Sequence, residues 1–226
     1  MKISNIDILI KKSNRKTLSI FIERDGSVCA LVPEKLTDEK VEEILETKEY
    51  QIHRNLAKWK QLNERHVLRE FVNGQGFLYL GRNYRLKLVD EILGQIHFTK
   101  GRFLLSKHEL DNAKKYFIEF YRNKLNERLK PIVNRYQSEM GVKANKIKVM
   151  ELKNRWASCS VKGNINFNWK CAMAPTDVIH YIVVHELVHL THMNHNSAFW
   201  NEIDKILPNY YTQVNWLKEN GAGMDL

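Results

Sequence analysis

The sequence predicts an α+β fold in two units, a β-rich N-terminal unit over residues 1–108 and a second domain over 109–226. Short alternating apolar segments separated by turn residues dominate the first part, whereas a long helical pattern starts near residue 108. A chain of 226 residues with 43% hydrophobic side chains is also large enough to bury a sizeable core. These observations exclude a disordered chain and favour a division near residue 108.

The pattern of apolar residues predicts three strands and one helix in the first 61 residues. The strands are expected near 6–10, 18–22 and 28–32, and the pair Asp25-Gly26 predicts a hairpin turn before the last of them. Thr37 followed by two acidic residues is typical of a helix N-terminus, and helical spacing extends this helix to about Gln61. Four more strands then predict a small antiparallel sheet, near 77–80, 84–89, 96–98 and 103–105.

A long helix over about 110–140, bent by Pro131, opens the second domain. After it the sequence predicts one strand near 147–152 and a hairpin that turns at Lys162-Gly163 into a strand over 165–169. Three further helices are expected, over about 176–193, 197–206 and 210–219.

Cysteines and apolar runs indicate the compartment. The three cysteines form no CxxC pair, which argues against a disulfide framework and against a four-cysteine zinc site. No run approaches the roughly 18 uncharged apolar residues of a membrane span, and the N-terminus does not read as a secretory signal. We therefore expect a cytoplasmic protein that has no membrane partner.

Positive charge is concentrated in residues 111–170, which hold 14 basic against 5 acidic residues in a chain of net charge +10. Much of it lies on the predicted long helix, including Lys114, Arg122, Arg128 and Arg135. Such a segment either contacts a polyanion such as nucleic acid or forms a solvated face that keeps the protein soluble.

The clearest chemical signal lies between Val178 and Trp200. His185 and His189 are four residues apart, so on a helix both imidazoles emerge from one face and reach the same ion. Glu186 places a carboxylate where it can take a proton from a water bound to that ion. Every other residue of 181–190 is apolar or aromatic, which predicts a buried helix. Because unpaired polar groups are costly there, we favour metal binding over hydrogen bonding among the three side chains alone.

A catalytic zinc ion usually takes three protein ligands and leaves one position for water. His192 follows His185 on the same helical stripe, but about 10 Å along the axis, which is too far for one straight helix. His195 follows Met193-Asn194, where an asparagine in the left-handed conformation could end the helix and return the chain to the metal. His195 is therefore the favoured third ligand, with His192 or an acidic residue such as Glu202 as alternatives.

Three segments together resemble the YgjP-like metallopeptidases, a bacterial family related to the SprT-like zinc proteases: RWASCS at 155–160, Asn168-Trp169 with Pro175, and HELVHLTHMNHNSAFW at 185–200. The stretch LGRNYRL at 80–86 extends the likeness toward the N-terminus. The resemblance implies a zincin-like domain with one Zn²⁺ per chain held by His185, His189 and His195, and with Glu186 as the catalytic acid/base. Ala157 departs from the family, which commonly has glycine there.

The leading hypothesis is zinc-dependent hydrolysis of peptide bonds in a polypeptide substrate, with Glu186 as general base and the 158–169 hairpin bordering the cleft. Arg155 either stabilises oxyanion charge or forms an ordinary ion pair. One alternative is a nucleic-acid-binding module with a structural or idle zinc, which would use the basic segment 111–170, and another is a protease recruited to DNA-bound proteins. A zinc hydrolase acting on a different bond is a third, because the motif specifies activated water and not the substrate.

Overall fold

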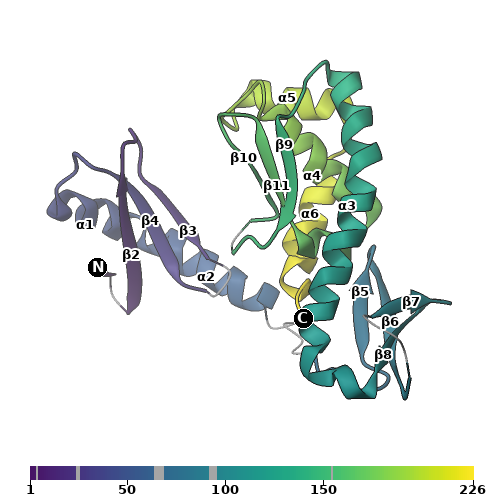
Figure 1. The fold of residues 1–226 in the computed structure, drawn as a ribbon. Helices are drawn as coiled ribbons and strands as arrows, with labels where there is room; N and C mark the ends of the chain where they lie inside the picture. Colours follow the sequence, from purple (N-terminus) through teal and green to yellow (C-terminus); the bar gives the residue numbers. More distant parts are fainter. Residues whose placement is uncertain (4, 24–25, 64–68, 92–95, 154) are drawn as a thin grey trace. The chain divides into compact units, whose positions relative to one another are not determined.

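The computed structural model describes residues 1–3, 5–23, 26–63, 69–91, 96–153 and 155–226. It confirms the α+β class and divides the chain into two compact units, Met1–His66 and Val67–Leu226 (Figure 1). Each unit has its own cluster of buried apolar side chains.

The first unit is a four-stranded sheet covered by two helices. Its strands are β1 (Lys2–Ile3), β2 (Ile6–Ser13), β3 (Ser19–Ile22) and β4 (Val28–Pro33), in the order β1-β2-β4-β3. β4 runs parallel to β2 and antiparallel to β3. Asp25 of the expected hairpin turn lies outside the described residues, whereas Gly26 has the positive φ of 85° that favours glycine.

The helix expected from Thr37 to Gln61 is divided into α1 (Asp38–Thr47) and α2 (Glu49–Asn63). The Thr37 hydroxyl accepts a hydrogen bond from the Lys40 amide, as an N-cap does. Lys48 leaves helical geometry at φ −102° and ψ 1°, which separates the two helices. The break lets buried residues of both helices, Leu45 and Ile52 among them, join one core with Ile8 and Val28 of the sheet.

The second unit begins with the sheet β5 (Gly76–Tyr79), β6 (Arg82–Val89), β7 (His97–Thr99) and β8 (Arg102–Ser106), in the order β5-β6-β8-β7. The two outer pairs are antiparallel, but β6 and β8 are parallel. The expectation of a purely antiparallel sheet is therefore wrong at the central pair. Gly94, which lies between the strands expected at 84–89 and 96–98, is outside the described residues.

The boundary expected near residue 108 falls inside the second unit, because one core spans that position. Phe77 and Phe103 of the sheet pack against Phe117 of the following helix, with ring centroids 4.2 and 5.1 Å away. The turn between β5 and β6 is also fastened to the later chain: the Leu80 and Gly81 amides donate to the Ala172 and Met173 carbonyls at 2.9 and 2.8 Å. The sheet thus supports the segment that leads into the candidate site.

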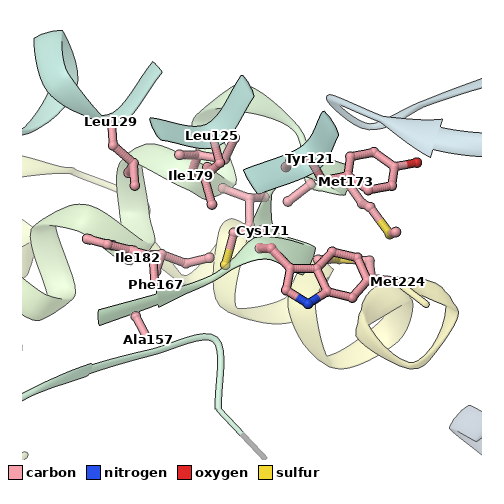
Figure 2. Close-up of a cluster of buried hydrophobic side chains, with 14 of the residues drawn as sticks. Tyr121, Leu125, Leu129, Ala157, Phe167, Cys171, Met173, Ile179, Ile182 and Met224 are labelled. Carbon is pink, nitrogen blue, oxygen red and sulfur yellow. The ribbon is translucent and has the colours of Figure 1, made fainter. Parts of the chain in front are cut away.

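A short 3₁₀ turn, η1 (Lys107–Asn112), precedes the long helix α3 (Ala113–Met140), which contains Pro131 and ends at Gly141 in the left-handed conformation. One side of α3 is buried against the strand and helix that follow it. Figure 2 shows the contact, in which Leu125 lies close to Ile179 and Tyr121 lies beside Met173. This packing places α3 against the helix over 176–188, which carries the start of the histidine motif.

The C-terminal elements complete the second unit. The strands β9 (Lys146–Met150), β10 (Ala157–Cys159) and β11 (Asn164–Asn168) form a sheet in the order β10-β11-β9, with β11 parallel to β9 and antiparallel to β10. They are followed by η2 (Trp169–Met173), α4 (Thr176–Val188), α5 (Ser197–Ile206), α6 (Tyr211–Asn220) and η3 (Gly221–Gly223) (Figure 1). In the described part of the chain, no helix has the length and apolar character needed to cross a membrane.

Candidate metal centre

The helix α4 is buried on nearly all sides, as its apolar composition predicts. Its interior includes Val183, Val184 and Leu187, each with no exposed surface. His185 is half-buried and Glu186 is 5% exposed, so the helix carries two polar side chains into an apolar environment. Such groups are tolerated only where a partner, a metal or a chemical role offsets their desolvation.

The helix ends earlier than the expected residue 193, at Val188, with His189 as its C-cap. The Val188 carbonyl accepts hydrogen bonds from the Thr191 amide and hydroxyl, both at 3.1 Å, and from the His192 amide at 2.8 Å. These bonds satisfy the helix end and turn the chain away from the axis.

The return to the metal site does not use a left-handed Asn194, because among the described non-glycine residues only Leu80, Lys100 and Asn209 have positive φ. Instead the Asn196 amide donates to the Asn194 carbonyl, and the Asn196 side chain caps α5 by accepting from the Phe199 amide at 3.0 Å.

The structure brings together the three histidines that the sequence analysis favoured. The possible ligand atoms of His185, His189 and His195 all lie within 4.8 Å of one another. The Nε2 atoms of His185 and His195 are 3.0 Å apart. Tetrahedral zinc holds nitrogen ligands at about 2.0–2.1 Å, so small side-chain adjustments would let these atoms share one ion.

The two alternatives for a third ligand have other contacts. His192 contributes its backbone carbonyl, which lies 3.1 Å from Nδ1 of His189. Glu202 forms an ion pair with Lys205 at 2.9 Å. Neither residue belongs to the three-histidine cluster found in the described part of the chain.

Neighbouring groups orient the imidazole rings. The Tyr181 hydroxyl lies 3.3 Å from Nδ1 of His185, and the His192 carbonyl accepts from Nδ1 of His189 in the metal-binding tautomer. With Nδ1–H donating to these oxygens from His185 and His189, Nε2 of each of the two rings keeps its lone pair for an ion. Sequence reasoning did not identify Tyr181, although its position four residues before His185 places the two side chains on one helix face.

The ring of Phe199 in α5 packs against all three imidazoles. Its ring centroid lies 5.0, 4.7 and 4.5 Å from those of His185, His189 and His195, and its side chain is fully buried. Around it, Tyr181 stacks on Tyr210 and Tyr210 stacks on Trp200. This aromatic column joins α4, α5 and the start of α6, and it fixes His195 relative to the histidines of α4.

Burial keeps the imidazoles neutral, which is the form that binds metal ions. It lowers the pKa of His185 to about 3, with smaller contributions from His189 and His195. Burial also lowers the pKa values of His189 and His195.

Glu186 is buried, and one of its carboxyl oxygens, the buried Oε2, has no hydrogen-bond partner among the described residues. Burial raises the pKa of the carboxyl to about 8, against the opposing charge of Arg155. A divalent cation beside the histidines would favour the ionised carboxylate. The unpartnered oxygen fits a group that accepts a proton from a molecule in the site.

A cavity of about 410 Å³ opens in front of these groups. The edge strand β10 forms one wall through Ala157, Ser158 and Cys159, and the histidines and Glu186 form the other. This confirms the prediction that the hairpin borders the cleft. Exposed Arg155 also lines the cavity, and burial raises the pKa of the Cys159 thiol.

The first half of the basic helix α3 carries four aromatic residues, and three of them are buried. Phe117, Phe120 and Tyr121 are buried in the core, and Tyr116 donates to Glu109 at 2.8 Å. Phe117, Phe120 and Tyr121 thus form part of the buried stripe of the helix, and Tyr116 is partly exposed beside it. Nucleic-acid binding through segment 111–170 stays a prediction.

No curated protein matches the sequence. Two solved structures are similar to part of the chain: the metallopeptidase zymogen of Pyrococcus abyssi abylysin (24% identity, 39% of this chain, 90% of that chain, TM-score 0.37) and that of Methanocaldococcus jannaschii jannalysin (26%, 40%, 91%, 0.35). The sequence profile of the YgjP-like metallopeptidase domain matches residues 16–220, a span that includes the three histidines, Glu186 and β10, and the chain therefore belongs to the YgjP-like metallopeptidase family.

Proposed function

We propose that this protein is a zinc-dependent peptidase in which His185, His189 and His195 hold one Zn²⁺ and Glu186 is the general base. Membership of a metallopeptidase family makes it a protease of the class that uses a divalent metal. The single observation that carries the finer proposal is the convergence of three neutral imidazoles beside a buried carboxylate with an unpartnered oxygen, at the wall of an open cavity.

The residues present fit zinc better than a harder cation. Three imidazole nitrogens suit zinc, whereas magnesium and calcium prefer oxygen ligands. Three protein ligands also leave one position of a tetrahedral site for water or substrate. Zn²⁺ held here would supply a Lewis acid that lowers the pKa of water and polarises a carbonyl group.

The chain's own groups account for the proton transfers and for substrate placement. Oε2 of Glu186 accepts the proton of the attacking water, and the same carboxyl then protonates the leaving amine. Among the described strands β10 has one neighbour in its sheet, β11, so its other edge is unpaired there. An extended polypeptide gains backbone hydrogen bonds from such an edge. Arg155, exposed at the cavity wall, is placed to favour developing oxyanion charge.

The test compares purified full-length variants for zinc content and for peptide products detected by mass spectrometry after incubation with an unfolded polypeptide. Glu186→Gln should keep stoichiometric zinc and lose about 10²-fold or more of the cleavage rate, because only the proton acceptor is removed. His195→Ala should lose zinc and activity together.

His192→Ala is the matched control for His195→Ala. Its side chain is outside the histidine cluster, and the carbonyl that orients His189 belongs to the backbone and survives the substitution. Zinc content and activity should therefore remain close to wild type. Full activity in Glu186→Gln, or zinc loss in His192→Ala equal to that in His195→Ala, would contradict the assignment.

A further inference from the structure

A second, apolar pocket of about 180 Å³ opens beside the metal cavity. Trp156, Tyr181, Ile182 and Leu217 line it, together with Ala157, His185 and Glu186. The last three residues also line the metal cavity, so the two spaces meet at the general base. Anything held at the proposed zinc therefore lies next to this pocket.

We propose that the apolar pocket receives the side chain of one of the two residues that flank the scissile bond, and that it selects an uncharged apolar side chain no larger than phenylalanine. This rests on the proposed peptidase function. A peptide paired with β10 sends alternate side chains to opposite faces, and Ala157 at the start of β10 lines both spaces. A residue beside the attacked carbonyl thus has the pocket within reach.

The lining determines the chemistry of the side chain. Among the described lining residues there is no lysine or arginine, so an acidic side chain would lose its hydration without gaining an ion pair. Glu186 is the only carboxyl among the described residues of the lining, and it is engaged with the reacting water in the proposed mechanism. The walls are otherwise aromatic and aliphatic, which favours leucine, methionine or phenylalanine.

The volume sets the upper size. An apolar cavity of about 150 Å³ accommodates a benzene ring. A pocket of about 180 Å³ therefore accepts a phenylalanine ring but leaves little room for an indole.

The walls of the pocket are held by the last helix and its continuation. A methyl group added to Gly221 would lie 2.7 Å from Cζ2 of Trp156, which shows how closely the chain after α6 approaches this indole. Tyr181 is stacked on Tyr210 at 6.2 Å between ring centroids. Leu217 of α6 belongs to neither the histidine cluster nor the cavity in front of it, so its size can be changed without touching the catalytic groups.

The experiment maps cleavage sites in a peptide mixture digested by the zinc-loaded full-length protein, with Glu186→Gln as the blank. The wild type should show about 10-fold or greater enrichment of leucine, methionine or phenylalanine over charged residues at one flanking position. Leu217→Ala should shift this preference toward larger aromatic residues, and Leu217→Phe toward alanine and valine. The preference is a ratio within one digest, so a partly unfolded variant still reports it.

Val214→Ala is the matched control, because Val214 is a half-buried aliphatic residue of the same helix that does not line the pocket. Its profile should equal that of the wild type. A second measurement uses the metal-free protein and two peptides that differ only in leucine or aspartate at the selected position. The leucine peptide should bind about 10-fold more tightly, and Leu217→Phe should reduce this difference.

Three results would overturn the inference while leaving the peptidase function intact: cleavage without preference at either flanking position, a preference for lysine, arginine or acidic residues there, or a preference that Leu217 variants do not change. Absence of any Glu186-dependent cleavage by the wild type would overturn the proposed function and the pocket assignment together.

Discussion

Tyr181 is the residue at the site that shows most directly how the metal motif is supported. Its hydroxyl lies 3.3 Å from Nδ1 of His185, and its ring continues the aromatic column through Tyr210 and Trp200. Burial raises its pKa, so the hydroxyl stays protonated at physiological pH. A neutral phenol beside Nδ1 helps to keep Nε2 directed at the ion.

Tyr181→Phe removes the hydroxyl while keeping the stacked ring. We expect zinc affinity to fall about 10-fold to 100-fold, the usual effect of losing a group that orients a histidine ligand. Competition with a chromogenic chelator measures this directly. Tyr210→Phe is the control, since it keeps the ring stack and the His185 contact. Equal zinc affinity in Tyr181→Phe and the wild type would show that the hydroxyl does not orient the ligand.

His180 provides a pH effect on stability that is separate from the metal site. Nδ1 of His180 lies 2.9 Å from the Tyr136 hydroxyl, and the side chain faces Asp177 and Arg135. Burial, aided by the charge of Arg135, lowers the pKa of His180 below its ordinary 6.5. Between the two pKa values the unfolded chain therefore binds a proton that the folded chain does not. This contribution to stability is complete above about pH 6.5 and is lost as the pH falls.

In His180→Gln the unfolding free energy should fall less than in the wild type when the pH is lowered from 7 to 5, because the amide does not titrate. The amide oxygen can still accept a hydrogen bond from the Tyr136 hydroxyl. Urea unfolding of the metal-free protein at several pH values measures the slope. An unaltered slope in His180→Gln would assign the acid sensitivity to other groups.

At the scale of elements, the ends of α4, α5 and α6 position the site. α4 stops at Val188, the Asn196 cap starts α5, and Phe199 one turn later lies under all three histidines. α6 then passes to η3, whose first residue Gly221 packs on Trp156. The C-terminal segment is anchored as well: the Lys170 ammonium pairs with Asp225 at 2.6 Å, and Arg69 donates to the Gly223 carbonyl at 2.9 Å.

Gly221→Ala tests this close contact. The new methyl would lie 2.7 Å from the Trp156 ring, so either the indole or the helix end must move, which we expect to cost about 1–3 kcal/mol of stability. Denaturant unfolding gives this value. Gly223→Ala is a matched control two residues away, because a methyl there meets nothing within 4 Å. Similar losses in the two variants would contradict the packing described.

At the scale of the whole molecule, the two apolar clusters share no residue, and the second includes the sheet β5–β8 together with the metal-site helices. A fragment over 67–226 should therefore fold and bind zinc as the full chain does. A fragment over 109–226 loses Phe77, Leu86, Phe103 and Leu105 from its core. Each such loss costs several kcal/mol against a typical total of about 5–15 kcal/mol, so this fragment should not fold.

Circular dichroism and zinc titration of the two fragments check both expectations. A stable, zinc-binding 109–226 fragment would support the domain boundary that the sequence predicts near residue 108. An unfolded 67–226 fragment would show instead that the second unit depends on residues 1–66.

The sequence by itself determined the α+β class, most of the strands and helices, and the motif that places His185, Glu186 and His189 on one buried helix. These features depend on local periodicity and on i, i+4 spacing, which neighbouring residues set.

The tertiary structure decided how distant segments meet. It made β6 and β8 parallel, joined their sheet to α3 in one core, divided the first helix at Lys48, and ended α4 at Val188. It also brought His195, Tyr181 and Phe199 around one point and placed an apolar pocket beside Glu186. Such features depend on side-chain packing between distant segments, and the apolar periodicity of one segment does not show how that segment packs against another.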